Sequence, residues 1–252
     1  MKRAFSPILV LVLLAILFAA QEVDAQKRRP ARPTTSKSKA NKPPTKPKIT
    51  VSTPSTREEE ILAEINLARS NPAQYASYLE TFRQNYNGKE LRLSGGKSLI
   101  TNEGVSACDE AITYLRSLKP LTPLQMRAGL GLGAKDHVGD LIRTGGSGHK
   151  GSDGSLPEVR VSRYGTWTES VGENIIYQST KTREDVISLI IDDGVANRGH
   201  RKNIFKPTFN VVGIALSPGA SGTIGVITFA GGFADRTTTG NTRTGSPAAA
   251  RF

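Results

Sequence analysis

The chain has 252 residues, of which 22% are charged and 37% hydrophobic, and its formal net charge is +12. It contains one cysteine, Cys108, which excludes an internal disulfide, so its folded part must be held by a hydrophobic core alone. Residues 26–50 contribute nine positive charges and no acid, and the first 25 residues are neutral, which leaves +3 for residues 51–252. The basic composition therefore does not describe the folded part.

The first 25 residues have the pattern of a secretory signal peptide. Lys2 and Arg3 precede an apolar run of 13 residues, and Val23 and Ala25 fit the small-residue positions of a cleavage site. As a helix this run is roughly 20 Å long, shorter than a bilayer core of about 30 Å. No later apolar stretch approaches the length of a membrane span. We expect an exported protein, secreted or periplasmic, with no transmembrane segment after cleavage.

Residues 26–54 combine Lys and Arg with Pro, Thr and Ser and have almost no apolar side chains. Such a segment predicts a disordered linker, because it cannot bury enough surface to offset its ordering entropy. Two roles remain open, a solubilising spacer and a tether to an anionic polymer or surface. Specific nucleic-acid binding is not expected, because no aromatic residues are interleaved with the cations. Residues 235–252 predict a disordered tail, so residues 55–234 are the expected folded domain.

Residues 56–141 predict a succession of helices. Thr56 begins a capping box for the first helix, and Pro72 ends that helix and starts a second. Thr101 is expected to cap a third helix, and Thr122 with the proline after it to open a fourth.

The second half of the chain predicts strands. Residues 144–170 indicate a long loop rich in Gly and Ser, and residues 174–178 a strand after it. Residues 182–193 have the period of a helix, while residues 209–217 and 223–229 are β-rich and joined by a hairpin-like turn. Helices followed by strands mixed with one helix predict an α+β fold around an antiparallel sheet.

Candidate functional residues come from two Gly-flanked polar loops, which contain His149 and His200. Glu169 and Glu173 lie between these loops in the sequence, just before the strand that begins at Asn174. Imidazoles with nearby carboxylates suit a divalent metal site or proton transfer near neutral pH. The alternative is a set of structural histidines that only make hydrogen bonds.

The remaining histidine, His137, lies on the apolar face of the fourth predicted helix and is expected to be buried and hydrogen-bonded. The sequence contains neither the H-E-x-x-H pattern of zinc proteases nor the G-x-S-x-G nucleophile elbow. Ser-His-Asp hydrolysis and nucleotide binding therefore have little support.

Three motifs give the sequence a family resemblance. They are the segment from Gly148 to Ser155, the box from Gly172 to Ile175, and the segment from Gly199 to Ala215. Their order and spacing resemble the CAP superfamily, also called SCP-domain proteins, over residues 57 to 233. The chain is most similar to the disulfide-free branch found in bacteria, other microbes and plants.

This resemblance implies a three-layer α-β-α sandwich of the α+β class, with a central, mainly antiparallel sheet and a cleft that holds two histidines and two acids. His149 and His200 match the metal-binding pair. Zinc or magnesium is the implied ion, because imidazole suits zinc while carboxylate and water suit magnesium.

The resemblance also assigns the acids of the cleft. Glu173 matches the first acid, and the second, a glutamate in animal and plant members, falls near Asp193. Aspartate is one methylene shorter, so Asp192 and Glu169 are alternatives for this position. An aromatic residue is expected four residues before Gly194, where this chain has Ile190.

Three further residues are expected to support the cleft. Asn174 starts the strand after Glu173, which should direct the carboxylate toward the cleft from a strand end. Arg198 and Arg201 can bind nearby carboxylates through both guanidinium nitrogens. The alternative for these arginines is surface solvation or an ion pair that fixes the loop.

Members of the family are linked to sterol, lipid and partner binding more firmly than to catalysis. The resemblance therefore favours a secreted binding module for a small lipid-like, sterol-like or anionic ligand, or for an extracellular partner. A metal-dependent hydrolase of the peptidase type, with Glu173 as general base, is the alternative. A cell-wall or matrix component that uses the domain as a scaffold is a third hypothesis.

Overall fold

The computed structural model describes residues 54, 56–179, 181–220 and 222–236. The predicted signal peptide, the linker apart from position 54, and the tail beyond residue 236 lie outside the described residues. The helices are α1 (Arg57–Ser70), α2 (Pro72–Arg83), α3 (Val105–Ser117), α4 (Ala128–Thr144), α5 (Pro157–Ser162), α6 (Thr182–Ile191) and α7 (Gly199–Ile204). The strands are β1 (Tyr86–Asn87), β2 (Glu90–Arg92), β3 (Ser98–Ile100), β4 (Gln125–Met126), β5 (Gly165–Ser179), β6 (Val211–Gly219) and β7 (Gly222–Asp235).

The strands form two sheets. The larger has the order β4-β6-β7-β5, in which β4 runs parallel to β6 and the other pairs are antiparallel. The smaller sheet, β1-β2-β3, is antiparallel throughout and is followed directly by the turn into α3. Strand β5 therefore forms an edge of the larger sheet, and the elements that carry the candidate site surround this edge.

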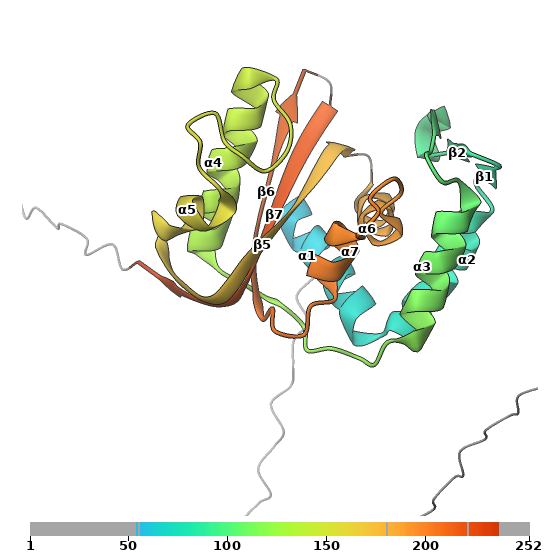
Figure 1. Ribbon diagram of the computed structural model, residues 1–252, viewed down its shortest axis with the longest axis horizontal. Helices are drawn as coiled ribbons and strands as arrows, with labels where there is room; N and C mark the ends of the chain where they lie inside the picture. Colours follow the sequence, from blue (N-terminus) through green and yellow to red (C-terminus); the bar gives the residue numbers. More distant parts are fainter. Residues whose placement is uncertain (1–53, 55, 180, 221, 237–252) are drawn as a thin grey trace, which may run out of the picture. The chain divides into compact units, whose positions relative to one another are not determined.

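Helices cover both faces of the larger sheet (Figure 1). Successive residues of a strand point to opposite faces, and the core follows this alternation. Ile175 and Val226 pack with α4 on one face, whereas Ile176 and Ile227 pack into the core shared with α1 and α6. The result is the expected α+β sandwich with a mainly antiparallel central sheet.

The helical predictions hold for the first two helices. Thr56 accepts a hydrogen bond from the backbone of Glu59, whose carboxylate accepts one from Thr56, so the capping box is present. Pro72 begins α2. The prediction for His137 is also confirmed, since the residue is fully buried on α4.

Two helix starts are corrected by the structure. Thr101 does not cap α3, because its hydroxyl donates to the Lys89 carbonyl and Gly104, with φ +72°, occupies the N-cap position. The fourth helix begins at Ala128 instead of at Pro123, because the residues between them extend to form β4. Pairing of β4 with β6 outweighs the helix-start preference of the Thr-Pro dipeptide.

The loop predicted over residues 144–170 is shorter than expected. It contains α5, which begins at Pro157, and its last residues belong to the long strand β5. The small sheet and α7 were not predicted. No helix among the described residues has both the length and the apolar character needed to cross a membrane.

Candidate functional site

Glu173 lies on β5 with a side chain that is only 1% exposed. Arg160, from α5, is also buried and donates to both of its carboxylate oxygens, at 3.0 Å to Oε1 and 2.8 Å to Oε2. His149 Nδ1 is 3.0 Å from Glu173 Oε1, and the His149 side chain is about half exposed. The expected contact between His149 and Glu173 is therefore present, with a buried arginine as the counter-charge.

His137 lies close to this pair. Its Nε2 is 2.8 Å from the Gly148 carbonyl oxygen and 3.7 Å from Glu173 Oε1. Its Nδ1 is buried with no hydrogen-bond partner among the described residues. The hydrogen bond from His137 thus holds the backbone of Gly148, the residue before His149.

His200 forms a second pair, with Asp192. His200 Nδ1 is 2.6 Å from Asp192 Oδ1, and Asp192 Oδ2 accepts from the His200 backbone N–H at 2.8 Å. The Asp192 side chain is 1% exposed, whereas that of His200 is 27% exposed. Asp192 has φ +56°, in the left-handed conformation that ends α6, and this turn brings the carboxylate to the first turn of α7.

Asp193 points elsewhere. Its Oδ2 accepts from the Asn102 backbone N–H at 2.6 Å, and its Oδ1 accepts from the Glu103 backbone N–H at 2.8 Å. These donors lie just before α3, so Asp193 joins the end of α6 to the start of α3. Of the two neighbouring acids proposed for the second position, Asp192 is the one that contacts His200.

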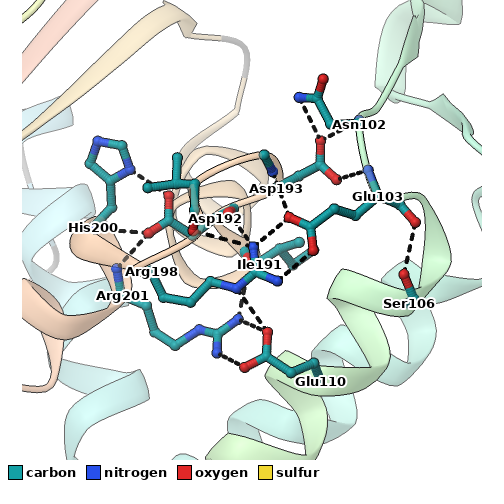
Figure 2. A network of polar contacts seen from close by, with 12 residues as sticks. Asn102, Glu103, Ser106, Glu110, Ile191, Asp192, Asp193, Arg198, His200 and Arg201 are labelled. Carbon is teal, nitrogen blue, oxygen red and sulfur yellow. Dashed lines mark hydrogen bonds and ion pairs between the residues drawn. The ribbon is translucent and has the colours of Figure 1, made fainter.

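Arg198 and Arg201 bind acids of α3 and of the segment before it, as Figure 2 shows. Arg198 donates to both oxygens of Glu103, at 2.6 and 2.7 Å, and Arg201 to both oxygens of Glu110, at 2.6 and 3.1 Å. The hydrogen bond from Arg198 is the main reason why the pKa of Glu103 falls to about 2. The pKa of Glu110 is likewise lowered, mainly by Arg201. Both arginines thus hold the α6–α7 turn against α3.

Two other predicted residues have different positions. Asn174 joins β5 to α7, because its side-chain amide donates to the His200 carbonyl at 3.0 Å and accepts from Asn203 at 2.9 Å. Glu169 is exposed, with φ +67°, beside an irregularity in the pairing of β5 with β7. The structure gives Glu169 no contact with either histidine.

A cavity of about 540 Å³ lies beside His200. Its apolar lining comes from both sheets and from α6, and includes Leu91, Leu93, Leu99, Ile176 and Leu189. Asp192 and His200 form part of its polar lining. This volume is within the range of about 300–1,000 Å³ that is typical of small-molecule sites.

Tyr177 connects the His149 loop to this cavity. Its hydroxyl accepts from the Gly148 backbone N–H at 2.8 Å, and its side chain lines the cavity together with His200. On β5, Glu173 contacts His149 while the next residue, Asn174, contacts the His200 backbone. Edge strand β5 therefore contacts both histidine segments through consecutive residues.

The donor atoms can be compared with what a metal ion requires. A neutral imidazole that donates Nδ1–H to a carboxylate keeps its lone pair on Nε2, the usual arrangement behind metal-binding histidines. Both His149 and His200 have their Nδ1 beside a buried carboxylate. Within the described ranges, no group of three or more His, Cys, Asp and Glu side chains is placed to hold an ion. Each of these histidines therefore offers its Nε2 as a single metal ligand, and the described residues form no closed protein cage around an ion.

Sequence reasoning missed Arg160. Its position between His149 and Glu173 in the chain gave one indication, because an inward carboxylate near a strand end needs a cationic partner. Which arginine supplies the charge depends on the packing of α5 against β5, which the sequence alone does not define.

Comparison with known proteins gives a family match. Residues 110–230 match the model of the CAP family, described as the cysteine-rich secretory protein family. No curated protein sequence matches the chain.

Two solved structures are similar in part. An outer surface protein from Borrelia burgdorferi is 16% identical, with a TM-score of 0.38, over 44% of this chain and 78% of that one. An extracellular protein with an SCP domain from Bacillus anthracis is 17% identical, with a TM-score of 0.36, over 50% of this chain and 37% of that one.

Proposed function

We propose that the chain, whose residues 110–230 match the model of the CAP family, is an exported binding module of that superfamily. Its ligand is a small lipid-like or anionic molecule that occupies the cavity beside His200. A divalent metal, zinc or magnesium, binds through the Nε2 atoms of His149 and His200. The cleft binds and does not catalyse.

The position and the hydrogen bonding of the His200 side chain are the main support for this proposal. The imidazole lines the cavity and is 27% exposed, while its Nδ1 is held by a carboxylate that is 1% exposed. A binding group needs to be both oriented and accessible, and a buried partner on the far nitrogen provides both conditions. His149 has the same relation to Glu173, with a more exposed ring.

The lining of the cavity supports the ligand class. Leucine and isoleucine side chains form most of its apolar wall, while polar groups that include His200 and acids at both ends of α6 complete the lining. Burying an apolar chain against this wall is favourable by roughly 25 cal/mol per Å². A molecule with an apolar body and a polar end that contacts His200 matches this lining.

No observation favours the hydrolase alternative. A general base must accept a proton from a bound water, but both oxygens of Glu173 already accept hydrogen bonds from Arg160. His149 contacts one of the same oxygens. The geometry gives Glu173 the role of orienting His149.

The expected export supports a place outside the cytoplasm, either secreted or periplasmic. The basic linker of residues 26–54 would then tether the domain to an anionic polymer or surface, since the domain itself is close to neutral. The same proposal includes an extracellular partner, because His200 lines the cavity and its side chain is 27% exposed.

Titration calorimetry with zinc tests the metal site. We expect the chain from Gln26 to bind zinc, and His149→Ala or His200→Ala to weaken binding at least about tenfold. Asp192→Asn should also weaken it, by about 10–100-fold, because the imidazole loses its orienting partner. Asp193→Asn is the matched control, since Asp193 binds the start of α3, and its zinc affinity should equal that of the unchanged chain.

Equal loss in the Asp192 and Asp193 variants would contradict the assigned roles. If zinc still binds with unchanged affinity after both histidine substitutions, the metal is not bound at His149 and His200. Turnover of a peptide or ester panel that requires zinc and His200 would replace the binding module with the hydrolase.

A further inference from the structure

The small sheet β1-β2-β3 presents apolar side chains to solvent. Ile100 is 76% exposed, the highest value among the large hydrophobic residues of the described chain, and Leu99 is 43% exposed. Cross-strand register places Leu99 opposite the buried Leu91, whereas Ile100 lies opposite Glu90 on the other face. Ile100 is therefore directed away from the core, and the small sheet lies near α2 and α3 (Figure 1).

Cations surround this exposed side chain. Lys89, Arg92 and Lys97 are all exposed, and Glu90 is the single acid of residues 86–100, so the segment carries a net charge of +2. Arg92 lies 3.7 Å from Glu90 and keeps a 66% exposed side chain. Neither Lys89 nor Lys97 has an ion-pair partner in the part of the chain that the structure describes.

We propose that residues 86–100 form a contact surface for an anionic lipid bilayer, with Ile100 entering the interface and the cations binding headgroups. An apolar side chain flanked by cations is the combination that favours such an interface. Charge argues against a second copy of the chain on this surface, because two segments of +2 would repel each other. The nearby acids already have partners, since Glu103 is paired with Arg198, Asp193 accepts from backbone N–H groups and Glu184 accepts from the Ser94 backbone.

The position of the surface adds a second argument. Leu99 and Lys97 also line the cavity described above, so the wall of the cavity and the contact surface share one hairpin. The proposal does not depend on zinc binding, and each can fail without the other.

The basic linker could bind anionic vesicles by itself, so the test needs a reporter within the sheet. In the chain from Gln26, Trp167→Phe removes the single tryptophan and Ile100→Trp introduces another. Leu132→Trp is the matched control, because Leu132 is also exposed, at 45%, but lies on α4. With vesicles of phosphatidylglycerol and phosphatidylcholine, we expect a blue shift of Trp emission and quenching by brominated acyl chains for Ile100→Trp only.

A second arm measures partitioning onto the same vesicles by sedimentation. Each cation close to an anionic surface strengthens binding about fivefold, so Lys89→Gln with Lys97→Gln should lower partitioning about 25-fold. Lys119→Gln with Lys135→Gln removes the same charge from other exposed positions and should leave it almost unchanged. Vesicles of phosphatidylcholine alone should bind much more weakly.

Three outcomes would overturn the proposal. Vesicle binding without a spectral change at position 100 would mean that the linker alone binds. Equal shifts at positions 100 and 132 would mean that the domain has no preferred face. A blue shift without vesicles that grows with protein concentration would identify a second copy as the occupant.

Discussion

Glu173 is a carboxylate with almost no exposure to solvent, and its charge must be balanced within the protein. Burial of an ion is unfavourable unless a partner is present with good geometry. Arg160 provides that partner, because its Nη2 donates to both carboxylate oxygens, and its Nη1 donates to the His149 and Ser155 carbonyls. The same arginine therefore balances Glu173 and holds the backbone of the His149 loop.

Arg160→Met should lower the free energy of unfolding by about 3–5 kcal/mol, because the Glu173 charge remains buried without a partner. Arg163→Met is the matched control. Arg163 makes ion pairs with Asp136 and Asp153 but is 41% exposed, so its loss should change the free energy by about 0–1 kcal/mol. Urea denaturation monitored by circular dichroism measures both. Similar values for the two variants would show that the Arg160 pair does not balance a buried charge.

Individual residues of the candidate site could be predicted in part from the sequence. The motifs around His149, Glu173 and His200 marked the residues, and the structure brings His149 to Glu173. The choice between Asp192 and its neighbour depended on one backbone angle, the left-handed φ of Asp192 at the end of α6. A sequence does not report that angle for a non-glycine residue, because the conformation is strained and is imposed by the surrounding contacts.

Helix α4 lies very close to strand β6 at one point, and glycine makes this approach possible. A Cβ atom added to Gly213 would collide with the backbone of Leu130 and Gly131 on α4. Both partners are main chain, so neither can move without shifting the helix. The His137 side chain depends on the same helix, which links this contact to the position of the His149 loop.

Gly213→Ala should therefore destabilise the protein by about 3 kcal/mol or more, at the upper end of overpacking effects. Gly131→Ala is the control on the opposite side of the same contact. Its added Cβ would have Ile214 O as the nearest atom, at 3.7 Å, and alanine favours a helix over glycine by roughly 0.5–1 kcal/mol. Thermal unfolding should show a lower midpoint for Gly213→Ala and an equal or higher one for Gly131→Ala. A stable Gly213→Ala variant would contradict this packing.

At the scale of elements, local signals predicted α1 and α2 because their starts are encoded within four residues, as in the Thr56 capping box. Strand β4 was missed because its two residues are extended only through pairing with β6, far away in the sequence. The same reason applies to β1, β2 and β3, which are two or three residues long. Alternation of apolar residues needs longer strands before it becomes visible.

Across the whole domain, the three layers meet at β5. The layer of α4 and α5 supplies His137 and Arg160, and the opposite layer supplies Asp192 and His200. The hydrogen bond between Tyr177 and Gly148 crosses from one side to the other at the edge of the sheet. The central claim is that the two imidazoles on either side of this edge bind one ion.

Nuclear magnetic resonance of the chain with ¹⁵N-labelled histidine tests this claim most directly, because the sequence has only three histidines. During a zinc titration, the Nε2 signals of His149 and His200 should shift together and reach completion at about one equivalent of zinc. His137 should not change, because its Nε2 is bound to the Gly148 carbonyl. If His149 and His200 respond at different zinc concentrations, or only one of them responds, the two rings do not share an ion and the account of the cleft is wrong.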